Sequence, residues 1–310
     1  MRKVVVGALG AAAIVWGAAQ PADAAVKIGL LTDFSGTQGA FGALYKDGID
    51  IFLKQHDGKI GGQDVQIIVE DGAGDPATTI AKAKKLVESD KIDVLFGPIN
   101  SATGAALRPY IVEQKMPTLI QSTTDEVIDD HYMYRTSFAG NEDAYLIGYL
   151  PGKAGYKKAV LLASNYVAGQ AAVKYFEQGF VAAGGTVVQK LMPRLGNADY
   201  APFISQLSSD ADVIICFLSG SDAIRFMQQI AGYDVKLPLF GYTSAVDETL
   251  LPAEGKAAIG FVGPATYSRP STRPRTKPSS SYGNRCSRRG SVLPGRAWAV
   301  MLRRRCSIRR

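Results

Sequence analysis

Residues 69–107, VEDGAGDPATTIAKAKKLVESDKIDVLFGPINSATGAAL, contain a strand–helix–strand pattern followed by the start of a second helix. This stretch begins with the end of an apolar strand and a Gly-rich turn, after which Asp75 and Pro76 open a helical pattern. Asp75 is suited to cap the helix, and Pro76 stands where its missing N–H costs nothing. A second strand pattern at Ile92–Phe96 then leads into a helix at Thr103–Gln114. Strand, helix and strand in this order predict a βαβ unit and a parallel sheet.

The same alternation continues on both sides of this stretch. Further strands are expected at Val26–Thr32, Val65–Val69, Pro117–Ile120, Lys158–Ala163, Thr186–Leu191, Asp212–Phe217, Leu237–Phe240 and Ile259–Val262. Further helices are expected at Ala40–Gln55, Glu142–Leu150, Ala168–Ala183, Ala201–Leu207 and Asp222–Ala231. A short extended piece at Tyr134–Thr136 precedes a boundary near Ser137–Asn141. This pattern predicts an α/β fold of two doubly wound parallel-sheet lobes rather than one large sheet.

The composition is that of a globular protein and argues against a nucleic-acid role for the body. The 310 residues are 46% hydrophobic and 20% charged, and the formal net charge is +7. Of the 35 Lys and Arg residues, 13 lie in residues 269–310, which contain no Asp or Glu. The first 268 residues therefore carry 22 basic and 28 acidic side chains. A mildly acidic body repels phosphate polymers.

Both ends of the sequence differ from this body. Residues 1–24 have a positive start, an apolar run too short to span a bilayer, and the small-x-small site Ala22-Asp23-Ala24. They predict a secretory signal peptide cleaved after Ala24 and a periplasmic location. Residues 269–310 are rich in Arg, Ser and Pro and have no apolar periodicity. Two explanations stay open: a disordered basic tail, or a frameshift product in place of a longer native C-terminus.

Catalytic, metal and cofactor motifs are scarce. Residues 72–77 match G-x-G-x-x-A, but Asp71 and Asp75 lie where a pyrophosphate needs positive potential, so we interpret the match as a capped turn. H-E-x-x-H, G-x-S-x-G, a P-loop Lys and Cys/His metal spacing are absent from the sequence. The two histidines, His56 and His131, are expected at the surface. We therefore expect that the protein is not an enzyme and that it has no catalytic residue, cofactor or metal.

Hydroxyl-rich loops follow three strands of the predicted first lobe. Phe41 lies in the glycine-rich segment 35–42, Ser101 follows the third strand, and Ser122 and Thr124 follow the fourth. Ligands of open α/β sheets bind beyond the carboxyl ends of the strands. Hydroxyls and the free N–H groups of helix N-termini suit a small carboxylate without Lys or Arg. These residues are candidates for a ligand site, with helix caps and core packing as the ordinary alternative.

Three loops of the second lobe occupy matching positions. They contain Tyr166, Ser221 and Thr243, each just beyond the end of a predicted strand. Tyrosine offers a stacking face and a hydroxyl group. These residues complete the candidate ligand set, although each is also compatible with an ordinary loop.

At this point the body resembles the type I periplasmic solute-binding proteins of ABC importers, in the leucine/isoleucine/valine-binding (branched-chain amino acid) group. The similar segments are VKIGLLTDFSGTQGAFG (26–42), VEDGAGDPATTIAKAKKLV (69–87), DVLFGPINSATGAAL (93–107), YRTSF (134–138), LLASNYVAGQAAV (161–173) and GFVGPATYS (260–268). The resemblance implies two lobes joined by a three-stranded hinge, closing on a small solute. It also implies delivery of that solute to ABC permease membrane subunits.

The resemblance also implies a division of the chain and roles for the candidate residues. Residues 25–138 would form the first part of lobe 1, 139–260 lobe 2, and 261–268 a return crossover toward lobe 1, which the sequence leaves incomplete at the C-terminus. By position, Ser101 and Thr124 would hold a ligand carboxylate by their hydroxyls. Ser122 would contribute backbone groups, whereas the Phe41 and Tyr166 side chains would form the first-lobe wall and second-lobe face.

The sequence departs from the amino-acid binders at Gly241-Tyr242-Thr243-Ser244, where they place an acid for the ligand ammonium. A buried ammonium without an anion is costly. Asp222 and Asp247 stay open as replacements. The expected ligand is therefore a branched-chain amino-acid-like solute or another small or aromatic carboxylate or amide. An extracellular sensor domain of the same fold is the main alternative, followed by an exported hydrolase or oxidoreductase and a basic-tail nucleic-acid binder.

Overall fold

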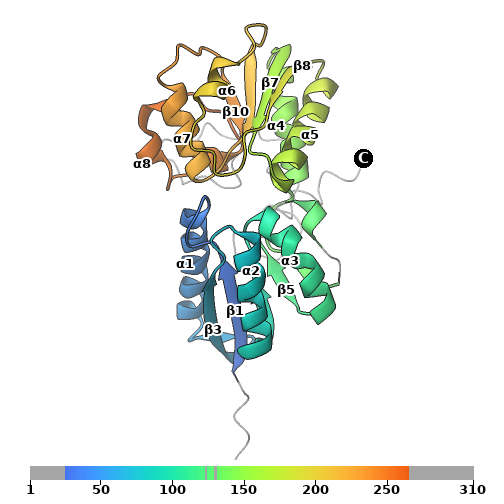
Figure 1. Ribbon diagram of the computed structural model, residues 1–310, viewed down its shortest axis with the longest axis vertical. Coiled ribbons are helices and arrows are strands. Elements are labelled where there is room, and N and C mark those ends of the chain that lie inside the picture. Colours follow the sequence, from blue (N-terminus) through green and yellow to red (C-terminus); the bar gives the residue numbers. More distant parts are fainter. Residues whose placement is uncertain (1–24, 123, 129–130, 265–310) are drawn as a thin grey trace, which may run out of the picture.

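The computed structural model describes residues 25–122, 124–128 and 131–264, which form two α/β lobes, one above the other (Figure 1). The first sheet has six strands in the order β2-β3-β1-β4-β5-β6, and the second has four in the order β10-β9-β7-β8. The first-sheet strands are β1 (Val26–Thr32), β2 (Lys59–Ile60), β3 (Gln63–Asp71), β4 (Val94–Phe96), β5 (Thr118–Ile120) and β6 (Met133–Arg135). The second-sheet strands are β7 (Lys158–Ala163), β8 (Thr186–Leu191), β9 (Val213–Phe217) and β10 (Leu239–Gly241).

Helices connect the strands in the way that the sequence pattern predicts. They are α1 (Gly39–Gln55), α2 (Pro76–Lys84), α3 (Ser101–Gln114), α4 (Gly140–Lys153), α5 (Val167–Ala182), α6 (Ala201–Ser205), α7 (Ser221–Ile230) and α8 (Leu251–Glu254). A π-helical turn, Lys85–Ser89, extends α2, and short 3-10 turns cover Asp125–Val127, Thr243–Ala245 and Gly255–Ala258. Only β2 pairs antiparallel, so both sheets are otherwise parallel in the described residues.

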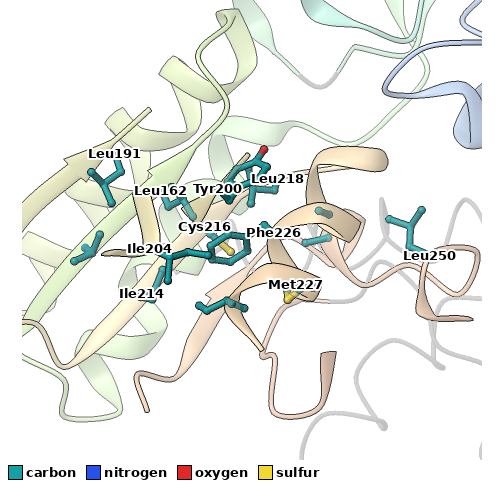
Figure 2. Close-up of a cluster of buried hydrophobic side chains, with 14 residues drawn as sticks. Leu162, Leu191, Tyr200, Ile204, Ile214, Cys216, Leu218, Phe226, Met227 and Leu250 are labelled. Atoms are coloured by element: carbon teal, nitrogen blue, oxygen red, sulfur yellow. The ribbon is translucent and has the colours of Figure 1, made fainter. Parts of the chain in front are cut away.

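The second lobe has a core on each face of its sheet. Successive residues of β7, such as Val160 and Leu161, point to opposite faces and are completely buried. Helices α4 and α5 cover one face, where Phe176 lies, and α6 and α7 cover the other, where Phe226 lies. Figure 2 shows the second of these cores, with Phe226 and Met227 of α7 beside Tyr200 and the strand residues. Burial on both faces holds the loops at the ends of the strands in fixed positions.

The first lobe is covered unevenly. Helices α2 and α3 pack on one face of its sheet over a buried cluster that includes Leu86, Leu95 and Leu107. On α1, by contrast, Gly42 is the one buried residue, and Leu44 and Phe52 are each 44% exposed. The α1 helix therefore keeps an accessible apolar side, and its first turn points at the second lobe (Figure 1).

One predicted strand is wrong. Residues Ile259–Val262 form no strand: a 3-10 turn precedes them, and only Val262 pairs, in a single bridge to Phe240 of β10. Gly260 has a φ of +94°, which interrupts the extended conformation. The other predicted strands and helices are present, with ends shifted by a few residues, and β2 was not predicted.

Some predictions fall outside the described residues. They are the signal peptide 1–24, the tail 269–310 and residues 265–268 of the crossover 261–268. The predicted division at 138/139 lies between β6 and α4. No helix among the described residues is both long and apolar enough to cross a membrane.

Candidate functional site

A cavity of about 830 Å³ lies where the two lobes meet. Loops at the carboxyl ends of strands from both sheets line it, and it continues along the apolar side of α1. Its aromatic lining residues are Phe41, Tyr45, Phe52, Phe96, Phe138, Tyr166, Phe217 and Tyr242. Its polar lining residues, besides the tyrosines, are Gln38, Ser101, Gln121, Ser122, Ser137, Ser219 and Ser244. The volume is within the range of about 300–1,000 Å³ that is typical of small-molecule sites.

Helix capping positions the polar groups of the first lobe. Asn100 follows β4 and its side chain accepts a hydrogen bond of 2.8 Å from the Ala102 N–H, so α3 starts at Ser101. Ser101 is 3% exposed, and its hydroxyl therefore lies at the positive end of α3. Ser122, after β5, accepts a 3.3 Å bond at its Oγ from the Thr124 N–H. Its carbonyl accepts a 3.1 Å bond from the Ser137 hydroxyl, which follows β6.

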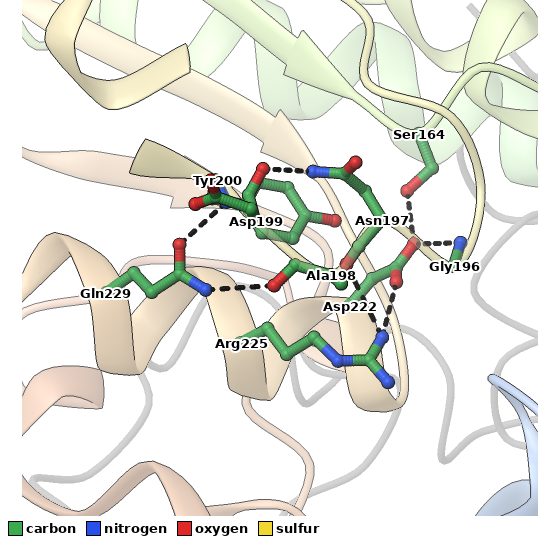
Figure 3. A network of polar contacts seen from close by, with 9 residues as sticks. All are labelled: Ser164, Gly196, Asn197, Ala198, Asp199, Tyr200, Asp222, Arg225 and Gln229. Carbon is green, nitrogen blue, oxygen red and sulfur yellow. Dashed lines mark hydrogen bonds and ion pairs between the residues drawn. The ribbon is translucent and has the colours of Figure 1, made fainter. Parts of the chain in front are cut away.

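A buried carboxylate, Asp222, holds together the loops of the second lobe (Figure 3). Its Oδ2 accepts hydrogen bonds of 2.9 Å from the Ser164 hydroxyl and 3.0 Å from the Gly196 N–H. Its Oδ1 lies 3.3 Å from Nη1 of Arg225. Burial nevertheless raises the pKa of this carboxyl. Because Ser164 follows β7 and Asp222 lies in the first turn of α7, this network fixes the loops that carry the lining residue Tyr166 and its neighbours.

Two backbone N–H groups of the second lobe donate hydrogen bonds to the first lobe beside the cavity. The Ala168 N–H, in the first turn of α5, donates to the Ser101 hydroxyl at 3.2 Å. The Ser221 N–H, which starts α7, donates to the Thr37 carbonyl at 3.1 Å. Gly220 makes the second contact possible, because a Cβ atom there would lie 2.0 Å from the Thr37 oxygen. The described structure is therefore one in which the two rims are in contact.

Aromatic rings form a connected wall on the side of the second lobe. Tyr166 stacks on Phe217 with ring centroids 6.2 Å apart, and Phe217 meets Tyr242 edge-on at 4.9 Å. Tyr242 in turn stacks with Phe138 at 6.4 Å, and its hydroxyl donates to the Gly140 carbonyl. Such rings favour offset or edge-to-face contact with another ring. The wall therefore suits a flat, aromatic solute.

The cavity is electrically neutral. No Asp, Glu, Lys, Arg or His is among the described residues that line it. Burial raises the pKa of the Tyr45 phenol to about 12 and also that of Tyr166, so both stay protonated. The Ser244 hydroxyl is buried without a hydrogen-bond partner. The polar groups of the cavity are therefore uncharged dipoles, namely hydroxyls, side-chain amides and backbone N–H groups.

The seven predicted site residues divide into two groups. Phe41, Ser101, Ser122 and Tyr166 line the cavity. Three others do not: Thr124 donates its N–H to the Ser122 hydroxyl, Ser221 contacts Thr37 through its N–H, and Thr243 begins a 3-10 turn beside lining residues. A ligand contact by any of the seven stays a prediction.

Several lining residues were not singled out from the sequence. Phe138, Phe217 and Ser219 lie within three residues of a predicted strand end or boundary, and Gln38 lies in the glycine-rich segment 35–42. Their position relative to the strand ends was the available signal. No group of three or more His, Cys, Asp or Glu side chains that could hold a metal occurs in the described ranges.

Comparison with known proteins gives a consistent result. The sequence pattern of the periplasmic binding protein family matches residues 25–287. Leu/Ile/Val-binding protein homolog 6 of Brucella melitensis is 29% identical over 270 residues, which are 84% of this chain and 69% of that protein.

Solved structures of solute-binding proteins also resemble this chain. An ABC-transporter solute binding protein from Rhodopseudomonas palustris BisB5, in complex with 3,4-dihydroxybenzoic acid, is 28% identical with a TM-score of 0.71 and covers 76% of this chain. Another from R. palustris, in complex with 4-hydroxybenzoate, is 28% identical with a TM-score of 0.73 and covers 77% of this chain. The chain spans 66% and 67% of those two proteins, about two thirds of their length.

Proposed function

The chain belongs to the periplasmic binding protein family, and we propose that it is the solute-binding component of an ABC importer for a small aromatic carboxylate. In this role it captures the solute in the periplasm and delivers it to a membrane permease without chemical change. The observation that carries the proposal is the cavity between the lobes, lined by eight aromatic residues and by neutral polar groups.

An aromatic acid fits this cavity better than an α-amino acid. The ammonium of an amino acid needs an anionic partner when it is buried. The position expected to supply one is occupied by Tyr242 and Ser244, which line the cavity. Neither Asp222 nor Asp247 lines it, and the Asp222 carboxylate already binds Ser164, Gly196 and Arg225. Two solved relatives bind dihydroxybenzoic acid and hydroxybenzoate, which supports the same ligand class.

The carboxylate of such a ligand has a suitable place beside Ser101 and the start of α5. The Ser101 hydroxyl and the Ala168 N–H already meet there, and Ser122 follows β5, the next strand of the sheet. A hydrogen bond to a charged group contributes about 1.5–3 kcal/mol. Two to four of these supply the roughly 5.5 kcal/mol that shifts an open–closed equilibrium from 1:99 to 99:1. Ligand binding can therefore drive closure without a cationic side chain.

A thermal-shift and calorimetric screen tests the proposal. We expect benzoate or a hydroxybenzoate to raise the melting temperature and to bind more tightly than cyclohexanecarboxylate or leucine. At a ligand concentration of about 100 times Kd the stabilisation is about 2.7 kcal/mol. Tighter binding of leucine than of every aromatic acid tested contradicts the proposal.

A variant pair locates the site. Ser101→Ala removes one hydroxyl from the predicted carboxylate position and is expected to weaken benzoate binding by about tenfold. Ser208→Ala is the control, because the Ser208 hydroxyl accepts from the Asp210 N–H and does not line the cavity. Equal affinities of the two variants place the carboxylate elsewhere.

A further inference from the structure

Three neutral polar side chains meet at one point of the cleft. Gln38 Nε2 donates to Ser219 Oγ at 3.5 Å, and the Tyr166 hydroxyl lies near both side chains. Gln38 and Ser219 are 8% and 7% exposed, and all three residues line the cavity. We call Gln38, Ser219 and Tyr166 the cross-lobe trio, because the first belongs to one lobe and the other two to the second.

The trio lies apart from the predicted carboxylate position along the rim of the sheet. Gln38 follows β1, whereas Ser101 follows β4 and Ser122 follows β5, the next two strands in order. Neighbouring strands are about 4.8 Å apart. The strands that lead to the trio and to the carboxylate position are therefore one to two spacings apart, which is about the length of a benzene ring with its substituents. A ring held by its carboxylate at Ser101 brings its far end to the trio.

The chemistry of the trio suits a neutral hydroxyl group. A side-chain amide and two hydroxyls can each donate and accept hydrogen bonds. A phenolic hydroxyl on a ligand needs one acceptor and one donor, and the trio supplies both. The Gln38–Ser219 distance of 3.5 Å is well beyond the usual 2.9–3.0 Å, so this bond is weak as it stands. A ligand oxygen placed beside both atoms, at the third corner of a triangle, replaces one long bond with two of ordinary length.

We propose that the cross-lobe trio is a second polar subsite that recognises a ring hydroxyl opposite the carboxylate, and so sets the preference of the protein among aromatic acids. This inference rests on the proposed function. Because the trio spans both lobes, a hydroxylated ring also bridges them, whereas a methyl group of similar size leaves buried polar groups without partners. A site built to bind a hydroxyl rejects the analogue that lacks it.

The test compares three ligands that differ at one position: benzoate, 4-hydroxybenzoate and 4-methylbenzoate. Their affinities are measured by calorimetry for the wild type, Ser219→Ala, Gln38→Met and Gln170→Met. The last is the matched control, because Gln170 is exposed on α5, bonds to Asn165 and does not line the cavity. We expect the wild type and the control to rank 4-hydroxybenzoate first and 4-methylbenzoate last.

In Ser219→Ala and Gln38→Met, we expect the affinity for 4-hydroxybenzoate to fall about five- to tenfold further than the affinity for benzoate, because one neutral hydrogen bond to the ring hydroxyl is lost. An equal loss for both ligands overturns the inference, since it shows that the trio only holds the lobes together. Unchanged affinity for 4-hydroxybenzoate overturns it too. A wild type that binds none of the three ligands contradicts the proposed function itself, which separates the two failures.

Discussion

Replacing Gly220 with alanine tests whether the observed contact between the lobes is needed for tight binding. Gly220 has φ +56° and ψ −135°, and a Cβ atom there would lie 2.0 Å from the Thr37 carbonyl oxygen. Ordinary contact begins at 3.4 Å, so the rims must separate by more than 1 Å at this point. The bond of 3.1 Å from the Ser221 N–H to Thr37 is then lost. That bond is worth about 0.5–1.5 kcal/mol, and the clash adds to it, so affinity is expected to fall tenfold or more.

A second glycine separates this effect from backbone strain. Gly184 also has a positive φ, +86°, but a Cβ atom there would have no neighbour within 4 Å. Both Gly184→Ala and Gly220→Ala should therefore lower the free energy of unfolding, by roughly 1–2 kcal/mol from strain. Only Gly220→Ala should lose affinity for an aromatic acid in calorimetry and fail to contract on ligand addition in small-angle X-ray scattering. Wild-type affinity in Gly220→Ala, or the same loss in both variants, refutes the reasoning.

Three further predictions concern charged groups, namely the carboxylates of Asp33 and Asp222 and the charge of the ligand. Burial raises the pKa of the fully buried Asp33 from 3.8 to about 6, and neither of its oxygens has a hydrogen-bond partner. The buried charge therefore lowers the free energy of unfolding by about 3 kcal/mol at pH 7.5 and by about 1 kcal/mol at pH 4.5. The Asp33→Asn variant should therefore unfold at a higher urea concentration than the wild type at pH 7.5, and most of this difference should disappear at pH 4.5. Asp222→Ala leaves the Ser164 hydroxyl and the Gly196 N–H without their acceptor, and urea unfolding should show a loss of about 3 kcal/mol. Benzamide should bind at least tenfold more weakly than benzoate in calorimetry, because the lining dipoles around Ser101 favour a negative charge.

Local signals explain why the fold was predictable. Asp75 accepts a 2.7 Å hydrogen bond from the Thr78 N–H, as its place before Pro76 indicates, because capping depends only on neighbouring residues. The strand expected at Ile259–Val262 shows the limit of this reasoning. Its apolar residues fit a strand, but Gly260 takes a positive φ and only Val262 finds a partner. Pairing depends on distant residues that an apolar run does not reveal.

The site was predictable to the level of the loop but not of the side chain. Strand order places the ends of β1, β4 and β5 at one edge, so Ser101 and Ser122 were found by position. In the loop after β9, Ser221 was expected to face the ligand, whereas Ser219 lines the cavity. Gly220 lies between them with a positive φ, which turns the chain so that Ser221 donates its N–H to the other lobe. Whether Ser219 or Ser221 lines the cavity is therefore decided by the backbone angles of the loop, which the sequence pattern does not reveal.

The placement of helix N-termini explains how a neutral cavity can respond to an anion. The first residue of α3, Ser101, meets the first turn of α5 at Ala168, so the positive ends of two helices face each other across the cleft. Each end carries about half a positive charge. Bringing them together is unfavourable when the space between them is empty, and favourable when a carboxylate occupies it. The same dipoles therefore resist closure without ligand and stabilise it with ligand, so the differential affinity that closure requires arises from the fold and needs no charged side chain.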